Sequence, residues 1–144
     1  KFTGVSRFWG IDANALKAEL DVSYRYGTKL EASAKVGYHR WKTADGGETI
    51  SYNRPQWEGG VNIRYMPVRP FTLEAGYEFA AGREYSNLGK LSDIHLVHLK
   101  ASYAFTSWFS LYGLTDNVLN RKYDILYGMP AQGINFMFGV DLKF

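Results

Sequence analysis

Apolar and polar side chains alternate with a period of two along most of the chain. The final residues show this most plainly: every second position from Ile134 to Phe144 is apolar, and Asn135, Asp141 and Lys143 are among the residues between them. Successive side chains of a strand point to opposite faces, so each such segment predicts a strand with one apolar and one polar face. Strands are expected near residues 13–26, 30–41, 50–66, 71–80, 93–105, 109–119 and 133–144, with a further, less regular candidate at 1–11.

The predicted connections differ in length in a regular order. Short turns at 27–29, 67–70 and 106–108 alternate along the chain with longer, more polar loops near 42–49, 80–92 and 120–132. Short turns on one side and long loops on the other are typical of an up-and-down meander and are not expected of a soluble sandwich. The predicted fold class is therefore all-β, one antiparallel up-and-down β-barrel region over residues 1–144 with seven to eight strands, either a closed small barrel or part of a larger one.

Aromatic residues gather near both ends of the apolar face, while Leu, Val, Ile and Ala occupy its middle. The short-turn end carries Tyr24, Tyr26, Tyr65, Phe71, Tyr103, Phe105, Phe109 and Phe144, and the long-loop end carries Tyr38, Trp57, Tyr77 and Phe79. An apolar band between two aromatic girdles, with a polar opposite face, is typical of a transmembrane β-barrel, in which closure pairs every backbone group. The alternative is a soluble barrel of lipocalin type, with the apolar face turned inward; the girdles favour the membrane.

Composition excludes several functions. The sequence has no cysteine, which excludes a disulfide framework, thiol catalysis and thiolate metal sites. Its net charge is +3, but Lys and Arg are interspersed with Asp and Glu and form no basic run, so nucleic acid is not an expected partner. The sequence starts with neither an initiator Met nor the features of a signal peptide, which indicates a mature chain or a piece of a longer one.

The last strand resembles the carboxy-terminal assembly signal of bacterial outer-membrane proteins. In that signal a Gly is followed by alternating hydrophobic residues that end on an aromatic, and Gly139, Leu142 and Phe144 occupy these positions. Met137 stands where a polar residue is usual. The resemblance implies that the barrel-assembly machinery reads this segment, with an exposed strand edge available for pairing.

The stretch SLYGLTDNVLNRKYDILYGMPAQGINFMFGVDLKF, residues 110–144, resembles the end of TonB-dependent outer-membrane receptors. There a strand ends on an Asn, a short stretch leads to a Tyr, and a Gly- and Pro-bearing loop precedes the final strand. The matching residues are Asn117, Asn120, Arg121, Lys122, Tyr123, Gly128, Pro130 and Gly133. Residues 9–39 and 53–85 are similar to earlier parts of the same family's barrel.

The resemblance implies a receptor that takes up a scarce nutrient such as an iron chelate, cobalamin or a glycan. It implies a bacterial outer-membrane location with a periplasmic carboxy terminus. The expected partners are outer-membrane lipid, the barrel-assembly machinery, a small-molecule nutrient ligand, and the TonB complex acting through a plug that this chain lacks. Barrels of such transporters have about 22 strands, of which this chain supplies about the last third. The alternative is a self-contained eight-stranded outer-membrane barrel with a structural, adhesive or lipid A-modifying role.

The long loops carry the candidate ligand-binding residues, Trp41, Arg83, Tyr85, Arg121 and Tyr127. Aromatic and Arg side chains at an outward-facing mouth can hold a ligand by stacking and charge-assisted hydrogen bonds. For each of them, packing within a girdle or loop is the alternative.

The histidines do not form a recognisable metal or catalytic pattern. His95 and His98 are three apart and so face opposite sides of a strand, while His39 lies in another strand. Ser92 with His95, or His98 with Ser102, could approach, but Ser on such a face is usually a small polar filler. We therefore expect no metal site, no cofactor, no catalytic residues and no enzymatic activity.

Overall fold

The computed structural model of the chain describes residues 2–12, 15–41, 55–83 and 89–143, with side chains from residue 16 onward except that of Trp41. The described residues form strands and the turns between them. They include no helix long and apolar enough to cross a membrane.

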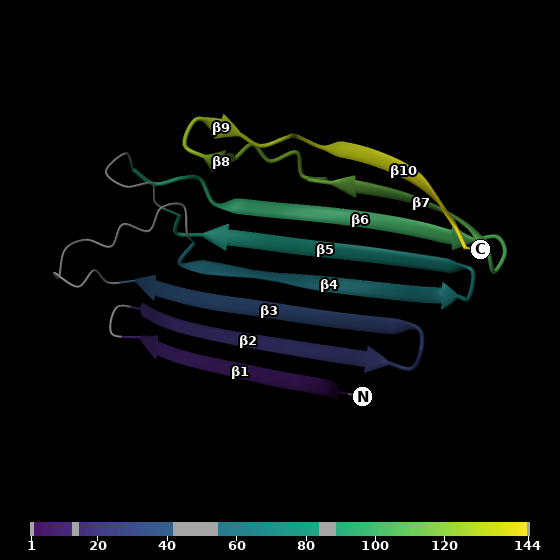
Figure 1. Cartoon of the computed structure of the whole chain (residues 1–144), viewed down its shortest axis with the longest axis horizontal. Helices are drawn as coiled ribbons and strands as arrows, with labels where there is room; N and C mark the ends of the chain where they lie inside the picture. The colour runs from purple at the N-terminus through teal and green to yellow at the C-terminus, as the bar shows by residue number, and fades with distance from the viewer. Residues whose placement is uncertain (1, 13–14, 42–54, 84–88, 144) are drawn as a thin grey trace.

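The described strands form an antiparallel meander (Figure 1). They are β1 (Phe2–Asp12), β2 (Ala15–Tyr26), β3 (Leu30–Trp41), β4 (Trp57–Val68), β5 (Phe71–Ala81), β6 (Ile94–Ala104), β7 (Phe109–Asp116), β8 (Asp124–Leu126), β9 (Met129–Pro130) and β10 (Asn135–Leu142). Eight of these strands make one sheet in the order β1-β2-β3-β4-β5-β6-β7-β10, and β8 pairs with β9 in a separate small hairpin. The predicted all-β, antiparallel, up-and-down fold is confirmed.

The sheet is open in the described part of the chain. β1 and β10 are its edge strands, each pairs with a single neighbour, and no pairing between described residues joins the two. Barrel closure therefore does not follow from the pairing within these residues.

Several strand bounds differ from those expected from the sequence. The strand expected at 109–119 ends at Asp116, because Asn117 has a φ of 50°, in the left-handed region, which ends an extended strand. The strand expected at 50–66 starts at Trp57 among the described residues and continues to Val68. The candidate strand at 1–11 has poor alternation, yet its described residues, 2–11, lie in β1, which pairs with β2 and has a register shift between Phe2 and Gly4.

The short turns after β2, β4 and β6 lie at one end of the sheet, and the longer connections after β3, β5 and β7 lie at the other, together with the two-residue connection between β1 and β2. The turns after β2, β4 and β6 lie at the right of Figure 1, together with both ends of the chain, and the β8–β9 hairpin lies at the left. Aromatic rings cluster at both ends: Tyr38 and Trp57 have ring centroids 4.6 Å apart at the long-loop end, and Phe105 lies 4.8 Å from Tyr103 and 5.4 Å from Phe109 at the short-turn end.

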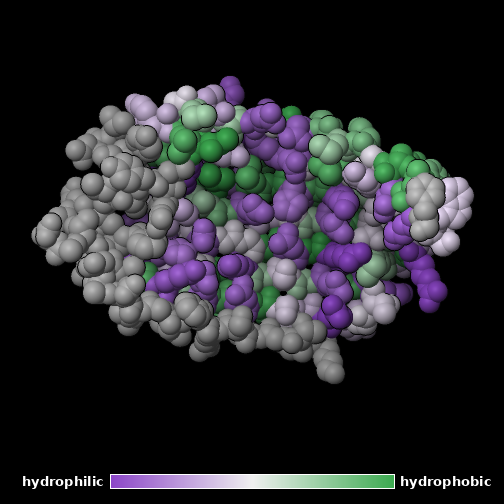
Figure 2. Space-filling model, viewed as in Figure 1, coloured by the Kyte–Doolittle hydropathy of each residue, from purple (hydrophilic) through white to green (hydrophobic). Residues whose placement is uncertain are grey.

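Charged side chains line the polar face of the sheet in rows set by the strand register. Figure 2 shows hydrophilic side chains gathered over the centre of this face. One row alternates in sign, with Arg25 2.9 Å from Glu31 and, further along, Glu74 lying 3.4 Å from Arg64 and 3.8 Å from Lys100. Opposite charges on facing strands stabilise such pairs, so much of the charge on this face is satisfied within the sheet.

The apolar face, by contrast, has no partner within the described residues. Ile63 and Leu99 in its middle are each 42% exposed, and Phe138 on β10 is 82% exposed. Among the described hydrophobic side chains only Leu91, in the loop between β5 and β6, is buried. The sheet is thus a single layer that lacks a hydrophobic core of its own in this part of the chain.

Candidate functional site

Arg83, a predicted ligand contact, is buried at the base of the loop between β5 and β6. Its side chain is 3% exposed, and its Nη2 donates to the carbonyl oxygens of Asp124 at 2.9 Å and Ile125 at 2.8 Å. Its Nη1 donates to the carbonyl of Ser92 at 3.4 Å, and its own carbonyl accepts from the backbone N–H of Leu91 at 2.9 Å. Arg83 therefore fastens the β5–β6 loop to the β8–β9 hairpin.

Burial of the Arg83 guanidinium also affects its pKa. Desolvation lowers the pKa of this group, and the neighbouring Tyr123, Asp124 and Asp93 act in the opposite direction. Arg side chains remain protonated in proteins, so the hydrogen bonds of the Arg83 guanidinium are charge-assisted. A direct role in ligand binding stays a prediction, while the contacts favour the loop-packing alternative.

The other predicted loop residues lie at the same end of the sheet where they are described. Arg121 is exposed, and Tyr127, between β8 and β9, is 56% exposed. Trp41 is the last residue of β3, and its side chain lies outside the described residues, as does the whole of Tyr85. The hairpin that carries Tyr127 is the one that Arg83 holds.

Asn117 and Asn120, not predicted to be site residues, close the base of the loop between β7 and β10. Both have positive φ, 50° and 48°, a conformation that Asn tolerates better than most residues. The buried Asn117 Nδ2 donates to the carbonyls of Arg121 at 3.0 Å and Gln132 at 3.1 Å, and Asn120 Oδ1 accepts from the backbone N–H of Ile134 at 3.1 Å. These bonds give a physical role to the Asn positions of the receptor-like motif.

The predicted assembly-signal residues lie on β10. Gly139 is opposite Tyr112 of β7, and a side chain at this position would overlap the Tyr112 ring. Leu142, the last residue of β10, is 48% exposed on the apolar face. Phe144 lies outside the described residues.

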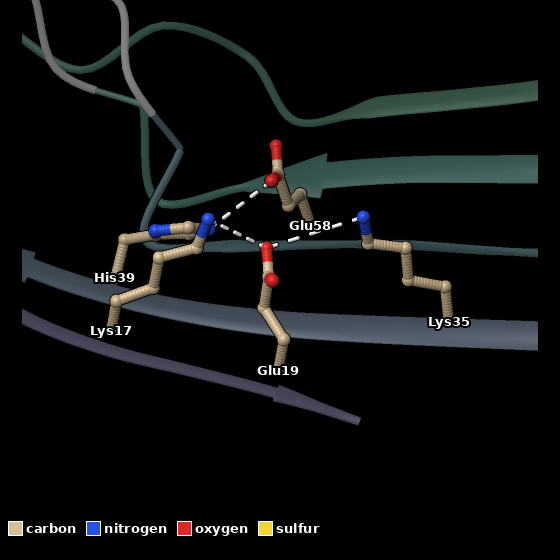
Figure 3. Close-up of polar contacts among 5 residues, drawn as sticks. All are labelled: Lys17, Glu19, Lys35, His39 and Glu58. Carbon is tan, nitrogen blue, oxygen red and sulfur yellow. Dashed lines mark hydrogen bonds and ion pairs between the residues drawn. The ribbon is translucent and has the colours of Figure 1, made fainter. Parts of the chain in front are cut away.

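A cluster of ionisable side chains projects from the polar face near the long-loop end (Figure 3). Glu19 of β2, His39 of β3 and Glu58 of β4 each offer one ligand atom, and these atoms all lie within 4.8 Å of one another. His39 Nε2 is 3.1 Å from Glu58 Oε1. The Nζ atoms of Lys17 and Lys35 lie 2.9 Å and 4.0 Å from Glu19 Oε1.

The register of three strands brings this cluster together. Glu19 lies opposite Gly37, Gly37 lies opposite Glu58, and His39 is two residues beyond Gly37 on the same face. Gly37 leaves space that a side chain would occupy, since a Cβ there would lie 3.2 Å from His39 Nε2, 3.5 Å from Glu58 Cγ and 3.7 Å from Glu19 Cγ. The sequence did not reveal the cluster because the long connection before β4 leaves the β3–β4 register undetermined.

The polar face also contains a hollow next to the cluster. Its volume is about 780 Å³, and residues of β2 through β6 line it, among them Asp21, Lys35, Glu58, Asn62 and Glu78. Three carboxylates and one lysine line this hollow, beside apolar residues such as Val22 and Ile94.

Comparisons with known proteins give a likeness of fold. No protein-family model and no curated protein matches the sequence. The fold is similar to that of a chain in the solved structure of the FpvAI–pyocin S2 complex, with a TM-score of 0.76 and 18% identity over 90% of this chain. FpvAI is a TonB-dependent receptor, and the match covers 20% of that chain, so this chain spans about a fifth of its length. At this identity the likeness shows the fold, a strand-rich sheet resembling the barrel wall of such a receptor.

Proposed function

We propose that the chain forms part of the wall of a TonB-dependent outer-membrane receptor that takes up a scarce nutrient. The observation that carries this proposal is the uncovered apolar face. Val61, Ile63 and Leu99 lie in its middle at 40–42% exposure, between aromatic clusters at both strand ends. Soluble monomers rarely expose a large contiguous apolar surface, whereas lipid covers such a band on a membrane barrel.

Strand length supports a membrane-spanning role. β2, β3 and β4 have 12 residues each, and β5 and β6 have 11. A tilted transmembrane strand needs roughly 9–11 residues to cross the hydrocarbon core. These strands are long enough to cross with their aromatic residues at the two interfaces.

The polar face supports an inward orientation toward the lumen. Its ion pairs and charged hollow suit a water-filled interior, and they would be unfavourable against lipid. Outer-membrane barrels have short periplasmic turns and longer extracellular loops. We therefore assign the long-loop end to the outside and the carboxy terminus to the periplasm.

The open sheet edges support a place in a larger barrel. In lipid, an unpaired edge leaves backbone groups unsatisfied, so both β1 and β10 need a neighbouring strand. The two are not paired with each other in the described residues, and the likeness to FpvAI covers a fifth of that chain. We propose that further wall strands pair with both edges.

Nutrient uptake is the finer part of the proposal, and it rests on the receptor-like motifs and the similar fold. Iron chelates, cobalamin and glycans are the proposed ligand classes. The proposed function involves no enzymatic reaction. Trp41, Tyr85, Arg121 and Tyr127 at the loop end are the proposed contacts, while Arg83 orders the loop that presents Tyr127. The TonB complex acts through a plug inside the barrel.

The proposal is tested by the intact mass of the mature protein in native outer membranes, together with uptake in cells that lack its gene. We expect a mass several times the 16.4 kDa of this chain. We also expect the deletion to abolish energy-dependent uptake of one labelled nutrient among the three classes. A mass near 16.4 kDa would instead indicate a free-standing small barrel, and the transport proposal would be wrong.

A further inference from the structure

We propose that Glu19, His39 and Glu58 form a binding site for a divalent transition-metal ion, with Zn²⁺ as the ion that fits best. This inference goes beyond nutrient uptake, because it needs only the register of β2, β3 and β4. It also differs from the expectation drawn from the sequence, in which His39 stood apart from the other histidines.

The ligand atoms have nearly the spacing that a metal ion requires. Two ligands that are each about 2.0–2.2 Å from a tetrahedral zinc ion lie roughly 3.3–3.6 Å from one another. His39 Nε2 and Glu58 Oε1 are already 3.1 Å apart, and Glu19 completes a set within 4.8 Å. A small rotation of the Glu19 side chain is the movement that closes the site.

The backbone beneath the site is built to admit all three side chains. Gly37 is buried directly between Glu19 and Glu58, and any larger residue there would press on His39 Nε2. The side chains of Glu19 and His39 are only 16% and 12% exposed, so they are held in place and partly shielded from water.

The types of ligand select the class of metal. One imidazole nitrogen with two carboxylate oxygens suits Zn²⁺ and its first-row neighbours, whereas Ca²⁺ and Mg²⁺ prefer oxygen ligands alone. With three protein ligands on an open face, water occupies the remaining positions.

Two lysines compete with the metal for Glu19. Lys17 Nζ lies 2.9 Å and Lys35 Nζ 4.0 Å from its carboxylate, but these side chains are 43% and 55% exposed. Exposed ion pairs contribute only about 0–1 kcal/mol, so Zn²⁺ can displace Lys17 into solvent. The competition predicts opposite effects for variants of the ligands and of the lysine.

The test is a zinc titration of the full-length protein, prepared without a polyhistidine tag, treated with chelator and held in detergent. Calorimetry and metal analysis should give one Zn²⁺ per chain with submillimolar affinity or better. His39→Gln and Glu58→Gln should each weaken binding by at least about 10-fold, the lower bound for losing even an outer partner of a metal site. Lys17→Gln should strengthen binding several-fold, because it removes the competitor.

The matched control is His98→Gln, another histidine of the polar face, which lies over Gly76 away from the cluster and should leave zinc binding unchanged. If a ligand variant fails to fold, the visible absorption and X-ray absorption spectra of the wild-type protein with Co²⁺ still report whether one nitrogen and carboxylate oxygens bind. Absence of zinc binding to the wild type, or equal losses in His98→Gln and His39→Gln, would overturn the site. Neither result bears on transport, which the mass and uptake measurements test separately.

Discussion

The two faces of the sheet differ in whether their side chains have interaction partners within the described chain. On the polar face, Glu74 pairs with Arg64 at 3.4 Å and with Lys100 at 3.8 Å, so these charges have partners within the protein. On the apolar face, Ile63 and Phe138 remain 42% and 82% exposed, with nothing from the described chain above them. This reverses the arrangement of a soluble protein, in which apolar side chains pack together in a core and charged side chains are exposed to water. The surroundings must supply the partner for the apolar face.

On both faces of the sheet, a glycine leaves room for a large side chain from the neighbouring strand, but the type of side chain differs. On the polar face, His98 lies over Gly76, and on the apolar face the Phe138 ring would be 3.1 Å from a Cβ at Gly113. Such a side chain packs flat against the backbone of the neighbouring strand and does not project far from the sheet. Packing of a side chain over a glycine of the adjacent strand therefore occurs on both faces. The faces differ in the chemistry of the side chain that covers the glycine.

The largest expected effect comes from a charge placed on the apolar face. Ile63→Arg puts a guanidinium at the middle of β4, which costs about 2–4 kcal/mol when it faces the bilayer midplane. The measurement is the free energy of unfolding in lipid vesicles, from reversible urea titration. The control is Asn62→Arg, one residue away on the polar face, which should change stability by a small fraction of this amount. Equal effects of the two variants would remove the distinction between the faces.

A steric change on β10 should have the next largest effect. Gly139→Val places a side chain where the Tyr112 ring lies and should destabilise folding by roughly 1–3 kcal/mol through overpacking. The double variant with Tyr112→Ser should recover much of the loss, as measured by a double-mutant cycle. If it recovers none, overlap with the Tyr112 ring is not the cause of the loss. A lower surface level of Gly139→Asp and of a Phe144 deletion in cells, with unchanged ligand affinity, would support the predicted role of these residues as an assembly signal.

Loss of the buried Arg83 should loosen the loop end without disturbing either face. Arg83→Met removes the donors to Asp124 and Ile125 and should lower the local stability of the β8–β9 hairpin by about 1.5 kcal/mol, the lower end for charged hydrogen bonds. Hydrogen exchange of the hairpin amides measures this change. Arg121→Ala, at an exposed residue in the connection between β7 and β8, is the control. A variant with an unchanged hairpin but reduced ligand affinity would make Arg83 a ligand contact.

The smallest expected effect concerns the ion pairs of the polar face. Glu74→Gln removes the partner of both Arg64 and Lys100, yet these are exposed pairs and the loss should stay below about 1 kcal/mol. Unfolding at low and high salt should show the difference shrinking as salt rises. A loss as large as that of Ile63→Arg would mean that this face is dry and buried.

The two faces were predictable because a two-residue period is a local property. Each strand from β2 to β10 in the main sheet could be assigned a polar and an apolar side from its own residues, and the end of β7 had a signal in Asn117. β1 was harder, because its pairing with β2 decides its structure more than its irregular alternation does.

The contacts that depend on distant parts of the chain were not predictable. Arg83 meets carbonyls 41 and 42 residues away, and nothing in its own loop identifies these partners. To predict that Glu19, His39 and Glu58 converge over Gly37, both the β2–β3 register and the β3–β4 register must be known. The tight turn after Tyr26 constrains the β2–β3 register, but the long connection before Trp57 leaves the β3–β4 register free.

The most direct test of the account is the environment of successive β4 residues in lipid. The chain contains no cysteine, so single-Cys variants at 61–65 can each carry one nitroxide label. Paramagnetic relaxation then compares access of lipid-soluble oxygen with access of a water-soluble nickel complex. The account predicts that labels at Val61, Ile63 and Tyr65 meet oxygen and that labels at Asn62 and Arg64 meet nickel. Labels at Val61 and Ile63 shielded from both reagents would place the apolar face inside a protein core and contradict the account.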